Sequence, residues 1–118
     1  MLIFSVYNHS NTDNKHTHDQ VKAYLRSKAI AFTECLGSWK GIQEYSIAVG
    51  DQHRETVEII CDTFLQEAFL YVNDRGFASF TYSHGEVVGA GKFTAVREGD
   101  QASLEGYTVI NGITYTIK

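Results

Sequence analysis

The sequence has no proline, and it holds only two cysteines, one tryptophan and one methionine among 118 residues. It also contains no repeat of fixed period and no low-complexity tract, which excludes repeat and fibrous architectures. No apolar run approaches the roughly 20 residues that a transmembrane helix needs. The apolar start, residues 2–7, is too short for a secretory signal and has no basic residue before it. We therefore expect no membrane association and a cytoplasmic location.

Charge of one sign is not concentrated anywhere in the chain. Lys and Arg number 10, Asp and Glu number 14, and the two signs are interspersed, with a formal net charge of -4. A protein that binds a nucleic-acid backbone needs clustered Lys and Arg, so we expect no nucleic-acid partner. Hydrophobic residues make up 43% and charged residues 20% of the chain, which are ordinary values for a globular protein. At this length we expect residues 1–118 to form a single α+β domain.

The cysteines and histidines show no strong metal-binding or nucleophilic pattern. Cys35 and Cys61 fall in separate elements, and we interpret both as reduced packing residues. His9, His16 and His18 lie in or beside one polar segment, where His16 and His18 could start a metal site. No matching ligand pair follows at a characteristic spacing, so we expect solvated loop histidines and no metal. The chain also lacks a Ser-His-acid arrangement, a phosphate-binding loop and a dinucleotide fingerprint.

Hydrophobic periodicity predicts alternating strands and helices before residue 73. Apolar or alternating runs predict four strands, at residues 2–7, 30–35, 43–49 and 68–72. Thr17 and Gln20 form a capping-box pattern, which predicts a helix from there to residue 29. A second helix is predicted by apolar residues at helical spacing, which are Val57, Ile60, Cys61, Phe64 and Leu65. The resulting β-α-β-β-α-β order is typical of a ferredoxin-like sandwich, in which two helices cover one face of an antiparallel sheet.

The C-terminal part of the chain is strand-like throughout. Further strands are predicted at residues 77–82, 87–88, 92–96, 107–110 and 113–117. Asn111-Gly112, between the last two runs, is the strongest short signal for a β-hairpin. We expect these additional C-terminal β-hairpins to extend the sheet or to build a second one. A long exposed strand edge would need a cover, for which a second subunit is the obvious candidate.

Two segments carry the candidate site. Gly37 and Gly41 bracket Trp39 and predict a glycine-hinged hairpin, and Glu44 then stands at the head of the third predicted strand. An acid held there by a rigid strand lies close to loops, where functional side chains gather. The second segment is Gln66-Glu67, where an acid ends a helix against the helix dipole. By themselves these patterns indicate a possible acidic site, and a solvated edge acid at Glu44 and a core-packing Trp39 are the simpler alternatives.

Three stretches make the chain resemble a known family nearly from end to end. They are residues 37–44 with the strand that follows, the run Phe64-Leu65-Gln66-Glu67 before Phe69-Leu70-Tyr71-Val72, and the tail pattern Gly91-x-Phe93-x-x-Val96-x-x-Gly99 with Leu104-x-Gly106-Tyr107-Thr108. On these motifs the chain resembles the phage-encoded S-adenosylmethionine hydrolases, better described as S-adenosylmethionine lyases. It departs from the family's pattern at Trp39, where tyrosine is common, and in a shorter loop before Glu44.

The resemblance implies cleavage of S-adenosylmethionine into 5'-methylthioadenosine and L-homoserine lactone, with no cofactor. In this reaction the substrate's own carboxylate attacks its γ-carbon. The resemblance implies Glu44 and Gln66 as catalytic residues, Glu44 anchoring the α-ammonium and Gln66 bonding the methionine tail or the ribose. It implies Trp39, Tyr45 and Glu67 as substrate-binding residues, with an aromatic ring on the adenine or facing the sulfonium. It also implies a small homo-oligomer, a trimer, with sites between subunits.

The implied role in a phage is to deprive host restriction and methylation systems of S-adenosylmethionine, in the cytoplasm of the host cell. Two alternatives stay open at this point. One is a non-catalytic phage protein that uses the same fold to bind a host protein, which the departure at Trp39 motivates. The other is true hydrolysis, in which water rather than the substrate carboxylate attacks the γ-carbon.

Overall fold

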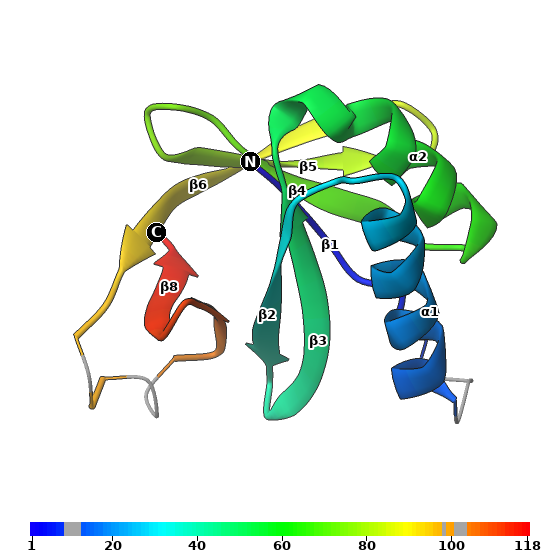
Figure 1. Ribbon diagram of the computed structural model, residues 1–118. Coiled ribbons are helices and arrows are strands. Elements are labelled where there is room, and N and C mark those ends of the chain that lie inside the picture. The colour runs from blue at the N-terminus through cyan, green and yellow to red at the C-terminus, as the bar shows by residue number, and fades with distance from the viewer. Residues whose placement is uncertain (9–12, 98, 101–103) are drawn as a thin grey trace.

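The residues that the structure describes form eight strands, which close into an antiparallel β-barrel with two helices packed on one side (Figure 1). This computed structural model describes residues 1–8, 13–97, 99–100 and 104–118. Around the barrel the strands follow the order β1-β3-β2-β7-β8-β6-β5-β4. Their bounds are β1 Leu2–Phe4, β2 Phe32–Trp39, β3 Ile42–Val49, β4 Ala68–Val72, β5 Phe77–Tyr82, β6 Val87–Ala95, β7 Gly106–Ile110 and β8 Ile113–Ile117. The helices are α1 Asn14–Ser27 and α2 Arg54–Thr63, the second preceded by a 3-10 turn at Asp51–His53.

The predicted ferredoxin-like sandwich is wrong, because the sheet does not stop at its outer strands. The elements up to β4 do follow the β-α-β-β-α-β order, and β4, β1, β3 and β2 are neighbours in the sheet. The remaining edge of β2 then pairs with β7 over residues 35–39, and that of β4 pairs with β5 over residues 68–72. β6 pairs with β5, and β8 pairs with both β6 and β7, which completes the ring. Closure gives each described strand a neighbour on both sides, while β1 pairs with β3 over residues 47–49 alone and leaves residues 42–46 of β3 without a ladder partner there among the described strands.

Side chains of the strands alternate between two apolar cores. The outer core lies between the barrel and the helices and comprises Leu2, Phe4, Val6, Val21, Leu25, Ile47, Val49, Val57, Ile60, Cys61 and Phe69. The inner core lies inside the barrel and comprises Ile3, Cys35, Ala48, Leu70, Val72, Ala78 and Ile110. Both cysteines are free and buried, as the sequence predicts, one in each core. A residue's position along a strand therefore decides whether its side chain faces the helices or the barrel interior.

Helix α1 begins at Asn14, before the predicted capping box. The Asn14 side-chain amide accepts from the Asn8 N–H at 2.8 Å and donates to the Asn8 carbonyl oxygen at 3.0 Å, which holds the incoming chain against the helix start. The Thr17 N–H already donates to the Asp13 carbonyl oxygen at 3.1 Å. Thr17 therefore lies inside the first turn, and the prediction that it caps the helix is wrong.

The three N-terminal histidines do not lie together in a loop. His9 is outside the described residues, and His16 and His18 are both in α1. His16 is exposed, whereas the His18 side chain is only 1% exposed, so the expectation of solvated loop histidines is wrong for His18. Within the described ranges, no group of three or more His, Cys, Asp or Glu side chains could hold a metal ion. The same part of the chain contains no helix long and apolar enough to cross a membrane.

The hairpin between β2 and β3 turns at Lys40 and Gly41, not at Gly37. These two turn residues have φ angles of 51° and 82°, the left-handed pair that a two-residue hairpin with right-handed strand twist requires. Gly37 instead lies inside β2, directly opposite Glu44 of β3. Trp39 is the last residue of β2 and stands next to the turn. The predicted hairpin and the turn glycine Gly41 are therefore confirmed, whereas a hinge at Gly37 is wrong, because that residue lies inside the ladder.

Candidate functional site

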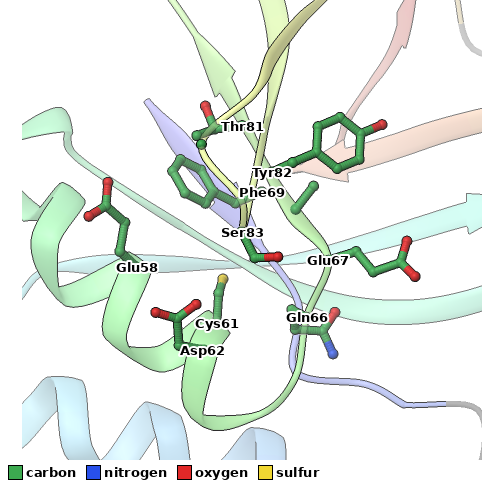
Figure 2. Close-up of a pocket in the computed structure, with 11 residues that line it drawn as sticks. Glu58, Cys61, Asp62, Gln66, Glu67, Phe69, Thr81, Tyr82 and Ser83 are labelled. Carbon is green, nitrogen blue, oxygen red and sulfur yellow. The ribbon is translucent and has the colours of Figure 1, made fainter.

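A pocket of about 200 Å³ lies on the outer side of the barrel, between α2, the start of β4 and the turn from β5 to β6 (Figure 2). It is lined by Glu58, Cys61, Asp62, Gln66, Glu67, Ala68, Phe69, Thr81, Tyr82, Ser83 and Gly85. Figure 2 shows the side chains of Glu58, Cys61 and Asp62 on α2, facing residues that come from the strands. Two of the predicted site residues, Gln66 and Glu67, belong to this wall.

The end of α2 places Gln66 at the pocket. The helix ends before Leu65, which adopts a left-handed conformation with φ 56°. This conformation lets the Gln66 N–H donate to the Cys61 carbonyl oxygen at 2.8 Å and turns the chain into β4. Across the pocket, the Ser83 N–H donates to the Glu67 carbonyl oxygen at 2.8 Å. Main-chain hydrogen bonds therefore fix the wall from two sides.

The Gln66 side chain is held by the segment that follows β1. Its Nε2 donates to the Tyr7 carbonyl oxygen at 2.8 Å. Because a carbonyl oxygen can only accept, this bond identifies the amide nitrogen and leaves Oε1 as an acceptor. Among the described residues, Oε1 has no hydrogen-bond partner. A fixed acceptor of this kind suits an ammonium or hydroxyl group of a ligand.

Acidic side chains dominate the charge of the pocket. Glu58, Asp62 and Glu67 line it, and the described residues of its wall include no Lys, Arg or His. Arg54 pairs with one of these acids, with its Nη1 at 4.0 Å from Glu58 Oε1. The pocket therefore favours a positively charged ligand. Burial raises the pKa of the Cys61 thiol to about 12, so this side chain is protonated at neutral pH and is not a nucleophile.

Glu44 and Trp39 lie away from this pocket, near the tip of the β2–β3 hairpin. Strand alternation puts Glu44 on the same face of β3 as Ala48, which belongs to the inner core. The Glu44 side chain is half-buried, and its carboxylate has no hydrogen-bond or ion-pair partner among the described residues. Trp39 is 59% exposed, so it is not a core-packing residue. Its ring lies against Gly106, where a Cβ would come within 2.5 Å of the ring carbon Cε3.

Tyr45 faces the opposite side of β3 and connects the hairpin to the pocket. Its ring centroid lies 6.4 Å from that of Tyr7 and 5.7 Å from that of His18. The Tyr7 carbonyl oxygen in turn accepts from the Gln66 amide. Tyr7 therefore bridges two predicted site residues, although nothing in the apolar run at residues 2–7 distinguishes it.

Sequence reasoning missed four residues that shape the pocket or hold its wall. Glu58 and Asp62 are separated by one turn of α2, a spacing that puts two carboxylates on one helix face and could have marked them. Tyr7 and Ser83 carry no such signal, because only the tertiary structure brings them to Gln66-Glu67. The pocket is thus lined by two segments of the chain, residues 58–69 and 81–85, and Tyr7 holds Gln66 from a third.

The predicted site residues fall into two groups, with Gln66 and Glu67 at the pocket and Tyr45 linked to them, and Glu44 with Trp39 near the hairpin tip. No curated protein matches the chain. The S-Adenosylmethionine lyase family matches residues 5–118, which include every described helix and strand except β1. Because this match covers nearly the whole chain, the protein belongs to the S-adenosylmethionine lyase family and is an S-adenosylmethionine lyase.

Proposed function

We propose that this lyase cleaves S-adenosylmethionine into 5'-methylthioadenosine and L-homoserine lactone by intramolecular attack. An oxygen of the substrate carboxylate forms a bond to the substrate γ-carbon, the bond between that carbon and sulfur breaks, and its electron pair stays on sulfur. Family membership over residues 5–118 carries this proposal. The reaction needs neither a proton transfer nor a protein nucleophile, which agrees with the protonated thiol of Cys61 in the pocket wall.

The charge change of the reaction indicates what the protein has to supply. The sulfonium and the carboxylate begin with opposite charges and end as a neutral thioether and a neutral ester. Bulk water stabilises the separated charges, so a site that excludes water and folds the methionine tail back on itself lowers the barrier. Because the carboxylate and the γ-carbon belong to one molecule, the protein contributes by holding the methionine tail in the folded conformation that reacts. Binding and folding the substrate therefore account for the catalysis.

The acidic pocket supports this mechanism through its charge. Glu58, Asp62 and Glu67 attract the ammonium and the sulfonium of the substrate and repel its carboxylate. A repelled carboxylate has no protein partner and is free to reach the γ-carbon. Gln66 Oε1 accepts a hydrogen bond from the α-ammonium or from a ribose hydroxyl, which orients the tail without competing for that carbon.

The hairpin tip supplies the remaining groups in this proposal. Glu44 anchors the α-ammonium, because its half-buried carboxylate has no protein partner among the described residues. Trp39 or Tyr45 covers the adenine or faces the sulfonium, where an aromatic face stabilises a cation. Glu67 adds negative charge at the pocket rim. Glu44 and Gln66 are thus the proposed catalytic residues, and the aromatic pair with Glu67 binds the substrate.

A second copy of the chain would complete the site. The pocket of about 200 Å³ is smaller than the roughly 300–1,000 Å³ of typical small-molecule sites. Glu44 and the exposed Trp39 stand on another surface of the same chain. In the proposed homotrimer, the hairpin tip of one subunit covers the pocket of the next, a head-to-tail contact that closes into a ring. Light scattering after size exclusion measures the mass, and a fully active monomer would contradict the arrangement.

The test of the chemistry is incubation with S-adenosylmethionine in ¹⁸O-labelled water, followed by chromatography and mass spectrometry. We expect 5'-methylthioadenosine together with a lactone that carries no label when it is analysed before it opens. Later opening of the lactone puts the label in the carboxyl group of homoserine. Attack by water on the γ-carbon would instead label the homoserine side-chain hydroxyl, and that result would replace the lyase mechanism by hydrolysis.

The biological role that we propose is phage anti-restriction in the host cytoplasm, through removal of S-adenosylmethionine from host restriction and methylation systems. The expected outcome is that expression of the protein raises the plating efficiency of an unmodified phage on a host whose restriction enzyme needs this metabolite. Glu44→Gln should abolish the protection. Protection that persists in the inactive variant would instead indicate binding to a host protein.

A further inference from the structure

Helix α1 buries a histidine beside the link between the hairpin and the pocket. The His18 side chain is 1% exposed, and its Nε2 lies 2.7 Å from Glu34 Oε2 on β2. Lys22 Nζ lies 2.7 Å from the same oxygen. His18 and Lys22 are one helical turn apart on α1, so a single carboxylate attaches two successive turns of the helix to the barrel. The imidazole is therefore held in place from one side.

The imidazole ring also completes a triangle with two tyrosine rings. Its centroid lies 5.9 Å from that of Tyr7, in an edge-on arrangement with an interplanar angle of 78°. It lies 5.7 Å from that of Tyr45, at an interplanar angle of 37°. Contacts between aromatic rings at these distances have preferred geometries. A displacement of the His18 ring would therefore displace both tyrosines.

This arrangement leaves one buried polar atom unsatisfied. Within the part of the chain that the structure describes, His18 Nδ1 has no hydrogen-bond partner. When Nε2 donates to Glu34, Nδ1 is a buried acceptor without a donor, which opposes folding. Such a group in a native structure calls for an explanation, and violations of this kind are expected at functional sites. Histidine supplies from one side chain both a flat ring for the tyrosines and an N–H for Glu34.

We propose that His18 is a positioning residue for the cleavage of S-adenosylmethionine. Its ring, anchored by Glu34, sets the orientations of Tyr45 and Tyr7, and the Tyr7 carbonyl oxygen sets the Gln66 amide. The inference rests on the proposed function, in which Tyr45 and Gln66 contact the substrate. His18 is itself buried and acts only through these neighbours.

Three variants distinguish the effect of the His18 ring from that of its hydrogen bond to Glu34. His18→Gln keeps an N–H donor toward Glu34 but removes the ring, whereas His18→Phe keeps a ring but removes the donor. His16→Gln, at an exposed position of the same helix, is the matched control. We expect His18→Gln to raise KM about tenfold with little change in kcat, as when a group that binds the substrate is misplaced. His16→Gln should behave as wild type, and His18→Phe should have a KM between the two.

A histidine with a merely structural role would give a different result. Both His18 variants would then melt at a lower temperature, but the folded protein would keep its KM. Kinetics are therefore measured at a temperature at which circular dichroism shows the variants to be folded. A KM within about twofold of wild type in His18→Gln overturns the inference. A larger KM in His18→Phe than in His18→Gln overturns the assignment of the effect to the ring.

The wild-type protein provides a test that does not depend on whether a variant folds. Addition of 5'-methylthioadenosine should shift the NMR signals of the His18 imidazole, because the ligand reorients or covers Tyr45, and should leave those of His16 unchanged. Unshifted His18 signals at saturating 5'-methylthioadenosine overturn the inference while the activity stands. A wild-type protein that releases no 5'-methylthioadenosine from S-adenosylmethionine would overturn the proposed function and, with it, this inference.

Discussion

The pocket beside α2 and the tip of the β2–β3 hairpin are built in opposite ways. In the pocket, main-chain hydrogen bonds from Gln66 and Ser83 fix the wall from two sides. Near the hairpin tip, Trp39 is largely exposed and Glu44 has no partner in the described part of the chain. A fixed wall selects a ligand by charge without having to rearrange, whereas free side chains become ordered only when a ligand or another subunit reaches them. In the proposed mechanism, one chain therefore presents a preformed half of the site and an incomplete half.

The largest expected effect comes from the incomplete half. Glu44→Gln removes the proposed ammonium anchor while it keeps the size of the side chain, and we expect kcat to fall by at least about 10²-fold, as when one preorganised electrostatic group is lost. Chromatography of 5'-methylthioadenosine measures the rate, and light scattering should show an unchanged oligomer. Glu55→Gln, in the first turn of α2 and outside the pocket wall, is the matched control. Rates like those of wild type in Glu44→Gln would remove Glu44 from the mechanism.

Mixing two inactive variants tests whether the two halves belong to different subunits. Glu44→Gln and Gln66→Ala should each be inactive when pure. If each site combines a hairpin tip from one subunit with a pocket from its neighbour, random reassembly should restore about one quarter of the wild-type activity. The measurement is the rate after unfolding, mixing and refolding, with each variant refolded alone as the control. No recovery from a mixed oligomer would place both residues in a site within one chain.

A smaller effect is expected at the exposed tryptophan. Trp39→Ala removes the aromatic face, and a loss of roughly 1 to 2 kcal/mol would raise KM about fivefold to thirtyfold. Trp39→Phe should recover most of this loss. Lys40→Gln is an informative control, because Lys40 Nζ lies 5.5 Å from the Trp39 ring centroid, where a substrate cation would compete with it. Lys40→Gln should therefore leave KM unchanged or lower it, and a rise would contradict cation binding at this ring.

The smallest expected effect is on stability, and it compares the cysteines of the two apolar cores rather than the two halves of the site. Burial raises the pKa of Cys61 to about 12 and that of Cys35 to about 11, from 9.0. The unfolded chain loses these protons at lower pH than the folded chain, so the thiols stabilise the fold fully below pH 9 and progressively less as pH rises toward 12. Urea midpoints measured above pH 9 should fall, and Cys61→Ala should reduce the slope. An equal slope in that variant would contradict the burial of the thiol.

Local patterns predicted individual elements but not how the sheet closes. The apolar spacing from Val57 to Cys61 correctly indicated α2, and Asn111-Gly112 is confirmed as the hairpin turn between β7 and β8, with φ angles of 51° and 78°. The pairing of β7 with residues 35–39 of β2 joins segments far apart in the sequence, and no local pattern marks such a partner. The helix start was misplaced for a related reason, because Asn14 contacts Asn8 outside the helical repeat.

The candidate site shows the same contrast between residues that local sequence places and residues that long-range contacts place. Gln66 and Glu67 lie between the end of α2 and β4, so the order of the chain alone brings them to the start of β4, and the family resemblance marks them as candidates. Tyr7 could not be predicted, because its role depends on one main-chain carbonyl and on ring contacts with two other elements. The exposure of Trp39 could not be predicted either, because the rest of the fold decides whether an aromatic residue beside a turn is covered. Sequence neighbours can thus bring a residue to the pocket in a predictable way, whereas contacts made only on folding cannot be predicted from the sequence.

The closed ring also affects how the protein is made. β7 and β8 follow all the other strands in the chain, yet β2 and β6 each need one of them as a neighbour. During translation the edges of β2 and β6 therefore stay unpaired until the final hairpin leaves the ribosome. Unpaired strand edges can pair with other chains and cause aggregation. A product truncated within that hairpin would be an aggregation hazard rather than a smaller working enzyme.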